Sequence, residues 1–219
     1  MTDGFSRAQA RSTLRRMSLR RKVAIEDASE EYDVCVSTSN AAHPSLSVDP
    51  RMRDGSLGYR GALPANSAPF ARDVSAAHAS TRIALGVAEG AKELAGAFPL
   101  ECNLDAFDAV SFSKGCYVGQ ENTARQRFRG AVRKRVAPLT LATAFDGLVP
   151  GAAVVNARGD AVGEVIASAD ARFALFRARV KFLRDVAAGA EGSSLRVGDV
   201  DAAFVAPRWW PASYMASDD

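Results

Sequence analysis

One cysteine stands in a setting that could make its thiol reactive. The stretch FSKGCYVGQENTARQRFRG, residues 112–130, places Cys116 between Gly115 and Gly119, and glycines let the backbone turn sharply on either side of a fixed side chain. A helix is predicted to start directly after the second glycine, and helix N-termini favour anions and thiolates. Lys114 adds a positive charge. These residues are compatible with a reactive thiolate and equally with a buried turn cysteine.

Two other uses of cysteine find little support in the sequence. A cysteine protease needs a histidine and an Asn or Asp partner for its nucleophile, and the chain offers only His43 and His78. A closed tetrahedral metal site needs four ligands, whereas Cys35, Cys102 and Cys116 are widely spaced. We therefore expect no metal site made by this chain alone, and a reducing compartment rather than a disulfide framework.

The residues around the cysteine predict a mixed α and β part. His78 lies on a predicted helix, where packing is a commoner role than catalysis, and Cys35 lies in a predicted strand as a core residue. The segment AVSFS, residues 109–113, predicts a strand that leads into the cysteine turn, which would then join a strand to a helix. The other expected elements are a helix at 7–22, strands at 22–29 and 31–38, a mostly irregular crossing at 40–71, and a helix from 72 to about Gly86.

A different pattern begins near residue 132. Short alternating apolar segments up to residue 206 are separated by the turn sequences VPG, RGD and SAD, which is typical of a small antiparallel barrel or sandwich. The expected fold class is therefore α+β, with a first domain at residues 1–130, a barrel at 131–210 and a frayed tail at 211–219.

Composition and charge exclude some classes of protein. The chain has 219 residues, of which 47% are hydrophobic, and it contains no apolar stretch of the roughly 18 residues that a membrane span needs. The start lacks the apolar segment of a secretory signal. The net charge is only +3, but basic residues gather at Arg7–Lys22 and Arg125–Arg135. The first block has the composition of an organelle transit peptide, although an ordinary solvated amphipathic helix is the favoured interpretation.

The octapeptide KGCYVGQE, residues 114–121, followed by TAR and FRG, closely resembles the signature of the YgfZ-type folate-binding proteins that assist iron–sulfur cluster assembly. Further segments resemble that family in the same order: LRRKVAIEDASEEYDV, DPRMRDGSLGYR, RIALGVAEG and PLECNLDAFDAVSF. The family is similar in fold to the aminomethyltransferase of the glycine cleavage system, the T-protein. Its usual first strands and helices have no counterpart before Arg15, so the resemblance implies an N-terminally truncated aminomethyltransferase-like folate-binding domain.

The resemblance also implies a function and a site. We expect a folate-dependent accessory factor for assembly or repair of iron–sulfur clusters, with Cys116 as the reactive group beside Lys114 and Tyr117. Tetrahydrofolate is the expected cofactor, bound weakly where the channel wall is truncated. The residues expected to contact it are Gly115, Gly119, Gln120, Glu121, Arg125, Glu101 and His78.

Two other functions stay open. The first is transfer of a one-carbon aminomethyl group to tetrahydrofolate, for which Glu101 or Asp49 could supply the carboxylate. The second is RNA binding or a role in tRNA modification, prompted by the arginine blocks and weakened by the lack of an aromatic-studded strand or zinc knuckle. The expected partners are folate and iron–sulfur client or assembly proteins, with no nucleic acid and no membrane. We expect a monomeric bacterial protein of the cytoplasm, or of the mitochondrial matrix if the source is eukaryotic.

Overall fold

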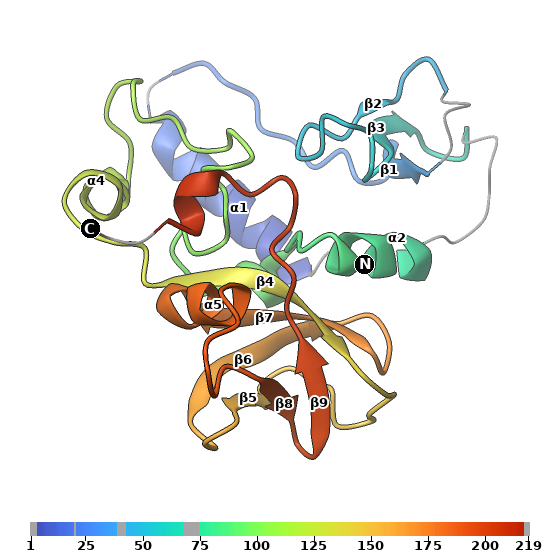
Figure 1. The fold of residues 1–219 in the computed structure, drawn as a ribbon. Helices are drawn as coiled ribbons and strands as arrows, with labels where there is room; N and C mark the ends of the chain where they lie inside the picture. The colour runs from blue at the N-terminus through green and yellow to red at the C-terminus, as the bar shows by residue number, and fades with distance from the viewer. Residues whose placement is uncertain (1–3, 20, 39–42, 68–74, 217–219) are drawn as a thin grey trace.

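Six strands in the second half of the chain close into an antiparallel barrel (Figure 1). The computed structural model describes residues 4–19, 21–38, 43–67 and 75–216. The order around the barrel is β4-β7-β6-β5-β8-β9, and β9 pairs with β4 to close it. The strands are β4 (Lys134–Leu141), β5 (Ala153–Asn156), β6 (Ala161–Ser168), β7 (Phe173–Arg179), β8 (Leu195–Val197) and β9 (Val200–Ala203). The predicted barrel is confirmed.

The alternation of side chains along the strands explains how the barrel is filled. Leu139 and Leu141 of β4 point into the core with Phe176 of β7, and all three are almost fully buried. The residues of opposite parity face outward, where Val136 and Leu175 pack in a second apolar cluster. Because both faces are covered along the middle of β4 and β7, consecutive apolar residues occur there, as in other strands buried on two faces, while charged residues lie at the strand ends.

A mixed layer lies against that outer apolar cluster (Figure 1). It contains a three-stranded antiparallel sheet in the order β1-β3-β2. Its elements are β1 (Tyr32–Ser37), β2 (Ser47–Val48), β3 (Tyr59–Pro64), α2 (Ser75–Ala84) and α3 (Ala91–Leu94). Helix α2 ends where predicted, before Gly86 with φ +80°, and a side chain at Gly86 would collide with Pro138 of β4.

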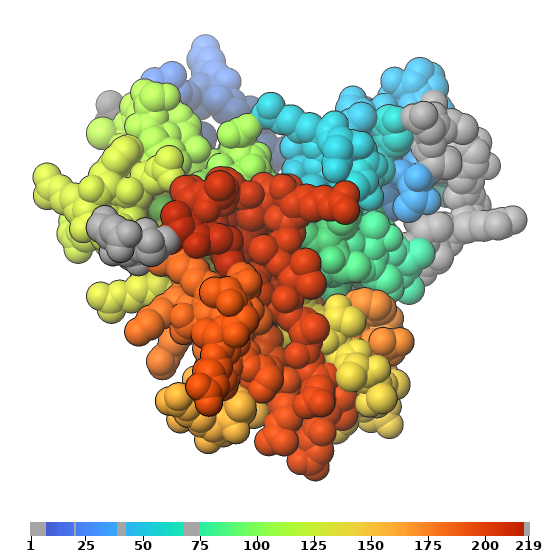
Figure 2. Space-filling model, in the orientation of Figure 1, coloured from blue at the N-terminus to red at the C-terminus, as the bar shows by residue number. Residues whose placement is uncertain are grey.

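The segment at residues 209–214 connects the mixed layer to the barrel. Trp209 donates a hydrogen bond from Nε1 to the backbone oxygen of Leu85, directly after α2, at 2.8 Å. Trp210 and Tyr214 then enter the barrel's core cluster. The space-filling view shows this C-terminal segment in red, running from the barrel over the middle of the face towards the upper layer (Figure 2).

Three further helices complete the fold. Helix α4 (Gln120–Phe128) follows the cysteine loop, α5 (Val180–Ala187) follows β7, and α1 (Gly4–Ser18) opens the chain. Most described side chains of α1 are exposed, and Arg15 reaches the backbone oxygen of Ile25 at 3.4 Å. The predicted solvated helix exists, but it ends at Ser18, before the expected residue 22, and its apolar residues Leu14 and Met17 are exposed as well.

Several local predictions were wrong. Residues 22–28 form a largely exposed irregular segment, and no strand among the described residues pairs with them. Residues 109–113 are likewise irregular, so a loop leads into the cysteine turn. Residues 180–187 form α5, whereas only short strands were expected beyond residue 132. The tail predicted to fray contains a 3-10 helix (Ala212–Tyr214) whose tyrosine is buried, while residues 217–219 lie outside the described part of the chain.

Candidate functional site

The cysteine loop is shaped by a few local hydrogen bonds. Lys114 donates its backbone N–H to Ser111 Oγ at 3.2 Å. Tyr117 donates its backbone N–H to Gln120 Oε1 at 3.2 Å, and the N–H of Gln120 bonds back to the Tyr117 oxygen at 3.1 Å. Gly119, with φ +87°, is the N-cap of α4, a conformation that side-chain-bearing residues rarely adopt. The predicted helix start and the glycine turn are both confirmed.

Phe112 explains why the loop before the cysteine is not a strand. Its ring meets Phe128 at the end of α4 edge-on, with the centroids 5.8 Å apart. The guanidinium of Arg127 lies 5.4 Å from the same ring. The ring of Phe112 therefore packs the loop against the far end of the helix that follows it.

Cys116 is exposed, so of the two interpretations left by the sequence the buried turn cysteine is wrong. The ammonium of Lys114 lies 4.9 Å from the centre of the Tyr117 ring, next to the thiol in sequence. No atom would crowd a side chain at Gly115. An exposed thiol on an open loop can act as a nucleophile or as a soft ligand for a metal.

Two other predicted site residues are joined by an ion pair. Arg125 and Glu121 lie one turn apart on α4, with Nη2 and Oε1 2.6 Å apart, and both side chains are largely exposed. Exposed pairs of this kind contribute at most about 1 kcal/mol. Both groups therefore remain accessible to a charged ligand.

Glu101 and His78 do not join the cysteine loop. Glu101 lies in a turn whose backbone oxygen accepts the N–H of Val136 at the start of the barrel, at 2.8 Å, and its carboxylate accepts the N–H of Phe98 at 3.3 Å. His78 lies on α2, which Figure 1 shows on the opposite side of the view from α4. Burial lowers the pKa of His78, and its Nε2 has no hydrogen-bond partner.

A partly buried ionic network near His78 was missed by the sequence analysis. The side chain of Asp49 is 2% exposed and accepts three hydrogen bonds from Arg51 at 2.6 to 3.1 Å. Glu89 binds Arg51 at 2.7 Å and Arg60 at 2.8 Å. Burial alone would raise the pKa of Glu89, but hydrogen bonds from Arg60 and Arg51 lower it to about 2. The network fastens the small sheet to the loop after α2.

The same bonds bear on Asp49 as a candidate carboxylate for one-carbon transfer. Burial would raise the pKa of Asp49, but hydrogen bonds from Arg51 outweigh burial and lower it. Both of its oxygens already bind Arg51. A carboxylate held in this way is a poor proton acceptor, so the geometry assigns Asp49 a structural role.

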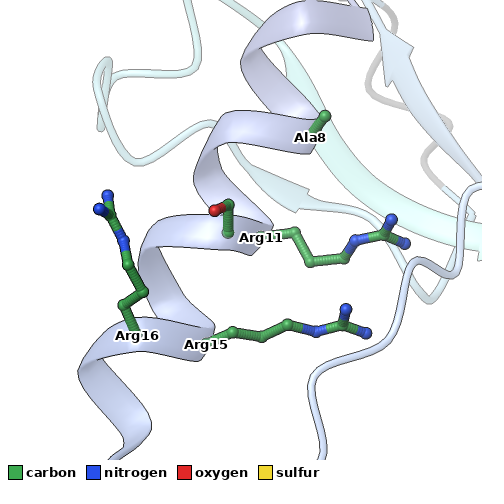
Figure 3. Close-up of a pocket in the computed structure, with 5 residues that line it drawn as sticks. Ala8, Arg11, Arg15 and Arg16 are labelled. Carbon is green, nitrogen blue, oxygen red and sulfur yellow. The ribbon is translucent and has the colours of Figure 1, made fainter.

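The basic helix α1 carries a shallow hollow of about 370 Å³. Figure 3 shows Arg11 and Arg15 extending to one side of the helix and Arg16 to the other. All lining residues belong to α1, so the hollow is a gap between long side chains and lacks walls from other elements. Over the described part of the chain, no helix has the length and apolar character needed to cross a membrane.

The comparisons with known proteins agree on one group. Residues 133–212 match the family model of the CAF17 C-terminal beta-barrel domain. Three relatives carry the name iron–sulfur cluster assembly factor IBA57, mitochondrial, or its homolog. They come from Mycosarcoma maydis (44% identical over 143 residues, 58% of this chain and 34% of the relative), Chaetomium globosum (42% over 125 residues, 55% and 28%) and Homo sapiens (37% over 132 residues, 58% and 35%).

These matches support some of the expectations drawn from the sequence, contradict one and leave others untested. The chain is related to proteins named as iron–sulfur cluster assembly factors, as the octapeptide indicated. It spans about a third of the length of these curated relatives. The expectation of a bacterial protein was wrong, because the relatives are mitochondrial proteins of eukaryotes. Folate binding, the aminomethyltransferase-like first domain and the roles given to single residues stay predictions.

Proposed function

We propose that the chain takes part in iron–sulfur cluster assembly in mitochondria, with Cys116 as its reactive group. The observation that carries the proposal is the exposed Cys116 thiol in a chain whose relatives are named as mitochondrial iron–sulfur cluster assembly factors. The loop before α4 presents this thiol to solvent, where another protein can reach it.

Thiolates are the preferred ligands of iron–sulfur clusters. One cysteine supplies one ligand, and the residues that the structure describes contain no group of three His, Cys, Asp or Glu side chains that could hold a metal ion. A cluster handled by this chain is therefore cargo, shared with ligands of a carrier or client protein. The other cysteines are less suited: Cys102 is buried, and burial raises its pKa to about 11.

We further propose tetrahydrofolate as the ligand of the cysteine loop and α4. Folates carry carboxylates, and a guanidinium binds a carboxylate through two parallel N–H bonds. Arg125 is exposed and its present partner Glu121 is exposed as well, so exchange of one carboxylate for another costs little. Lys114 and Tyr117 would lie on the thiol side of the same ligand. Glu101 and His78 lie elsewhere and are left out of the proposal.

Replacement of Cys116 tests the proposal. The wild-type chain and Cys116→Ser should be expressed in the mitochondria of cells that lack their own IBA57-type protein. We expect the wild type to restore the activity of cluster-dependent enzymes and Cys116→Ser to restore little of it, because serine keeps the shape of the loop but removes the soft ligand. Both purified proteins should unfold at the same temperature, since the side chain is exposed.

Cys35→Ala is the matched control, because Cys35 is a half-buried thiol in β1, and it should restore the enzymes. Failure of the wild-type chain would refute the assembly function, whereas full restoration by Cys116→Ser would refute the role of the thiol. Calorimetric titration of the wild-type chain with tetrahydrofolate tests the folate part separately, and an absence of binding would refute that part alone.

A further inference from the structure

Helix α1 combines a high positive charge with exposed apolar side chains. Residues 4–25 contain seven arginine and lysine residues and no aspartate or glutamate. The side chains at residues 8–18 are exposed or half-buried, and none of them joins a core cluster. Leu14 and Met17 are 53% and 55% exposed. The helix therefore presents most of its described surface to solvent.

The charged and apolar side chains lie on different stripes of α1. Arg11 and Arg15 are four positions apart and extend to one side, whereas Arg16 extends to the other (Figure 3). Leu14 and Met17 are three positions apart, and residues at that spacing share one face of a helix. At 3.6 residues per turn, this apolar stripe lies between Arg16 and the pair Arg11 and Arg15. An apolar stripe with arginines on both borders is typical of a helix that lies in a membrane surface.

Helix α1 contains no acidic residue that could pair with its arginines. On α4, by contrast, Arg125 pairs with Glu121 one turn away. The residue one turn from Arg11 is Arg15, and like charges at this spacing destabilise a helix. An anion between the two guanidinium groups removes this repulsion, and a guanidinium binds phosphate oxygens through paired N–H bonds. The helix is therefore suited to a surface that carries many phosphate groups.

We propose that α1 binds the surface of an anionic phospholipid bilayer and lies parallel to it. Leu14 and Met17 enter the boundary between the head groups and the acyl chains. The aliphatic stems of the three arginines cross this boundary and bring their guanidinium groups to the lipid phosphates. Burial of the apolar stripe and attraction to the phosphates then act together.

A bilayer fits α1 better than RNA, which also carries phosphates. Bases of single-stranded RNA stack on aromatic rings, whereas the exposed apolar side chains described on α1 are Leu14 and Met17, which have no ring. A membrane partner was not expected from the sequence, where no apolar segment is long enough for a span. A helix that lies on a bilayer needs no span.

Co-sedimentation of the full chain with lipid vesicles tests the proposal. The probes are vesicles of phosphatidylcholine alone and vesicles that also contain anionic phosphatidylglycerol, both at physiological ionic strength. We expect at least about tenfold tighter binding to the anionic vesicles, because each basic residue near an anionic surface contributes about fivefold in affinity. The binding should weaken as salt is added, since salt screens the attraction.

Two double variants separate the charge from the apolar contact. Arg11→Gln with Arg15→Gln should bind the anionic vesicles about twentyfold more weakly. Leu14→Gln with Met17→Gln should bind them about tenfold more weakly, because two apolar side chains no longer leave water. Glutamine keeps the helix propensity, and α1 joins no core cluster, so both variants should unfold at the wild-type temperature.

Arg158→Gln with Arg196→Gln is the matched control for charge. Both arginines are exposed and belong to the barrel, one in the turn after β5 and one in β8. This variant loses the same net charge as the α1 arginine variant. It should bind the anionic vesicles within about twofold of the wild type, because charges far from the bilayer are screened.

Three outcomes would overturn the proposal. Failure of the wild-type chain to bind anionic vesicles would show that α1 does not recognise a lipid surface. Equal weakening by the barrel control would show a diffuse effect of net charge and no role for the helix. Undiminished binding by Leu14→Gln with Met17→Gln, together with tighter binding of the wild type to a single-stranded RNA oligonucleotide, would assign the arginines to nucleic acid.

Discussion

Glu89 gives the sharpest test of how the small sheet is held to the rest of the molecule. Its carboxylate binds Arg51 and Arg60, which precede it in the sequence by 38 and 29 positions. Replacement by glutamine removes the negative charge between two guanidinium groups and keeps the size of the side chain. The variant Glu89→Gln should therefore lower the free energy of unfolding without opening a cavity.

The magnitude follows from the pKa. A shift of the Glu89 pKa from 4.5 to about 2 corresponds to about 3 kcal/mol, since each pH unit is worth about 1.4 kcal/mol. The side chain is 31% exposed, so screening by solvent reduces the expected loss to about 2 kcal/mol at pH 7. Because the folded-state pKa is the lower one, this contribution is complete above about pH 4.5 and disappears as the pH falls through 2.

Urea unfolding at two pH values measures this contribution. Trp209 provides the fluorescence signal, since its indole is bonded to the segment after α2. The difference between the wild type and Glu89→Gln should be about 2 kcal/mol at pH 7 and about a quarter of that at pH 2.5. As a control, Glu164→Gln breaks an ion pair with Arg177 in which the glutamate is 49% exposed, and it should cost less than about 1 kcal/mol. A difference for Glu89→Gln that is equal at both pH values would refute the electrostatic reasoning.

Two further substitutions test buried features. Glu93→Gln should lower the free energy of unfolding by about 3 to 5 kcal/mol in urea titrations, because it leaves the buried guanidinium of Arg82 without the carboxylate that now lies 2.6 Å away; a loss below about 1 kcal/mol would mean that water reaches the pair. Gly58→Ala should cost about 3 kcal/mol, since its Cβ would collide with the backbone oxygen of Ser37. Gly90→Ala, with the same φ of +80° in open space, should cost only about 1 kcal/mol, and equal losses at the two glycines would contradict the clash.

The barrel could be predicted because its strands carry their own signals. In β4 and β7, apolar residues such as Leu139 and Phe176 recur at every second position, and turn residues separate the segments. The end of β7 was less certain. Val180 and Leu183 are spaced for a helix face, and both are buried, but two apolar residues do not distinguish a short helix from a longer strand.

The two strands that were predicted wrongly show why a local sequence pattern is not sufficient to predict a strand. The segment at residues 22–29 alternates as a strand does, but a strand exists only where another strand pairs with it, and none of the strands in the described part of the chain pairs with this segment. The segment before the cysteine failed for another reason. Phe112 packs against Phe128, sixteen positions later along the chain. A contact between residues so far apart cannot be predicted from a local pattern.

The candidate site was likewise only partly predictable. The loop and helix start at residues 114–121 were indicated by two glycines and the polar residues after them. Glu89 and the arginines that bind it are far apart along the chain, with α2 between them, so their contact could not be predicted from local patterns. The segment DPRMRDGSLGYR contains three of the four network residues, and a cluster of both charge signs in one loop was the one local signal available.

Helix α4 has the cysteine loop at one end and Phe128 at the other. A helix of nine residues spans about 13 Å. The exposed face of α4 is highly polar and its one buried residue is Thr123, so few apolar contacts hold the helix in place. The ring contact between Phe112 and Phe128 joins the far end of the helix to the loop before Cys116, so the position of the Cys116 thiol depends on this contact.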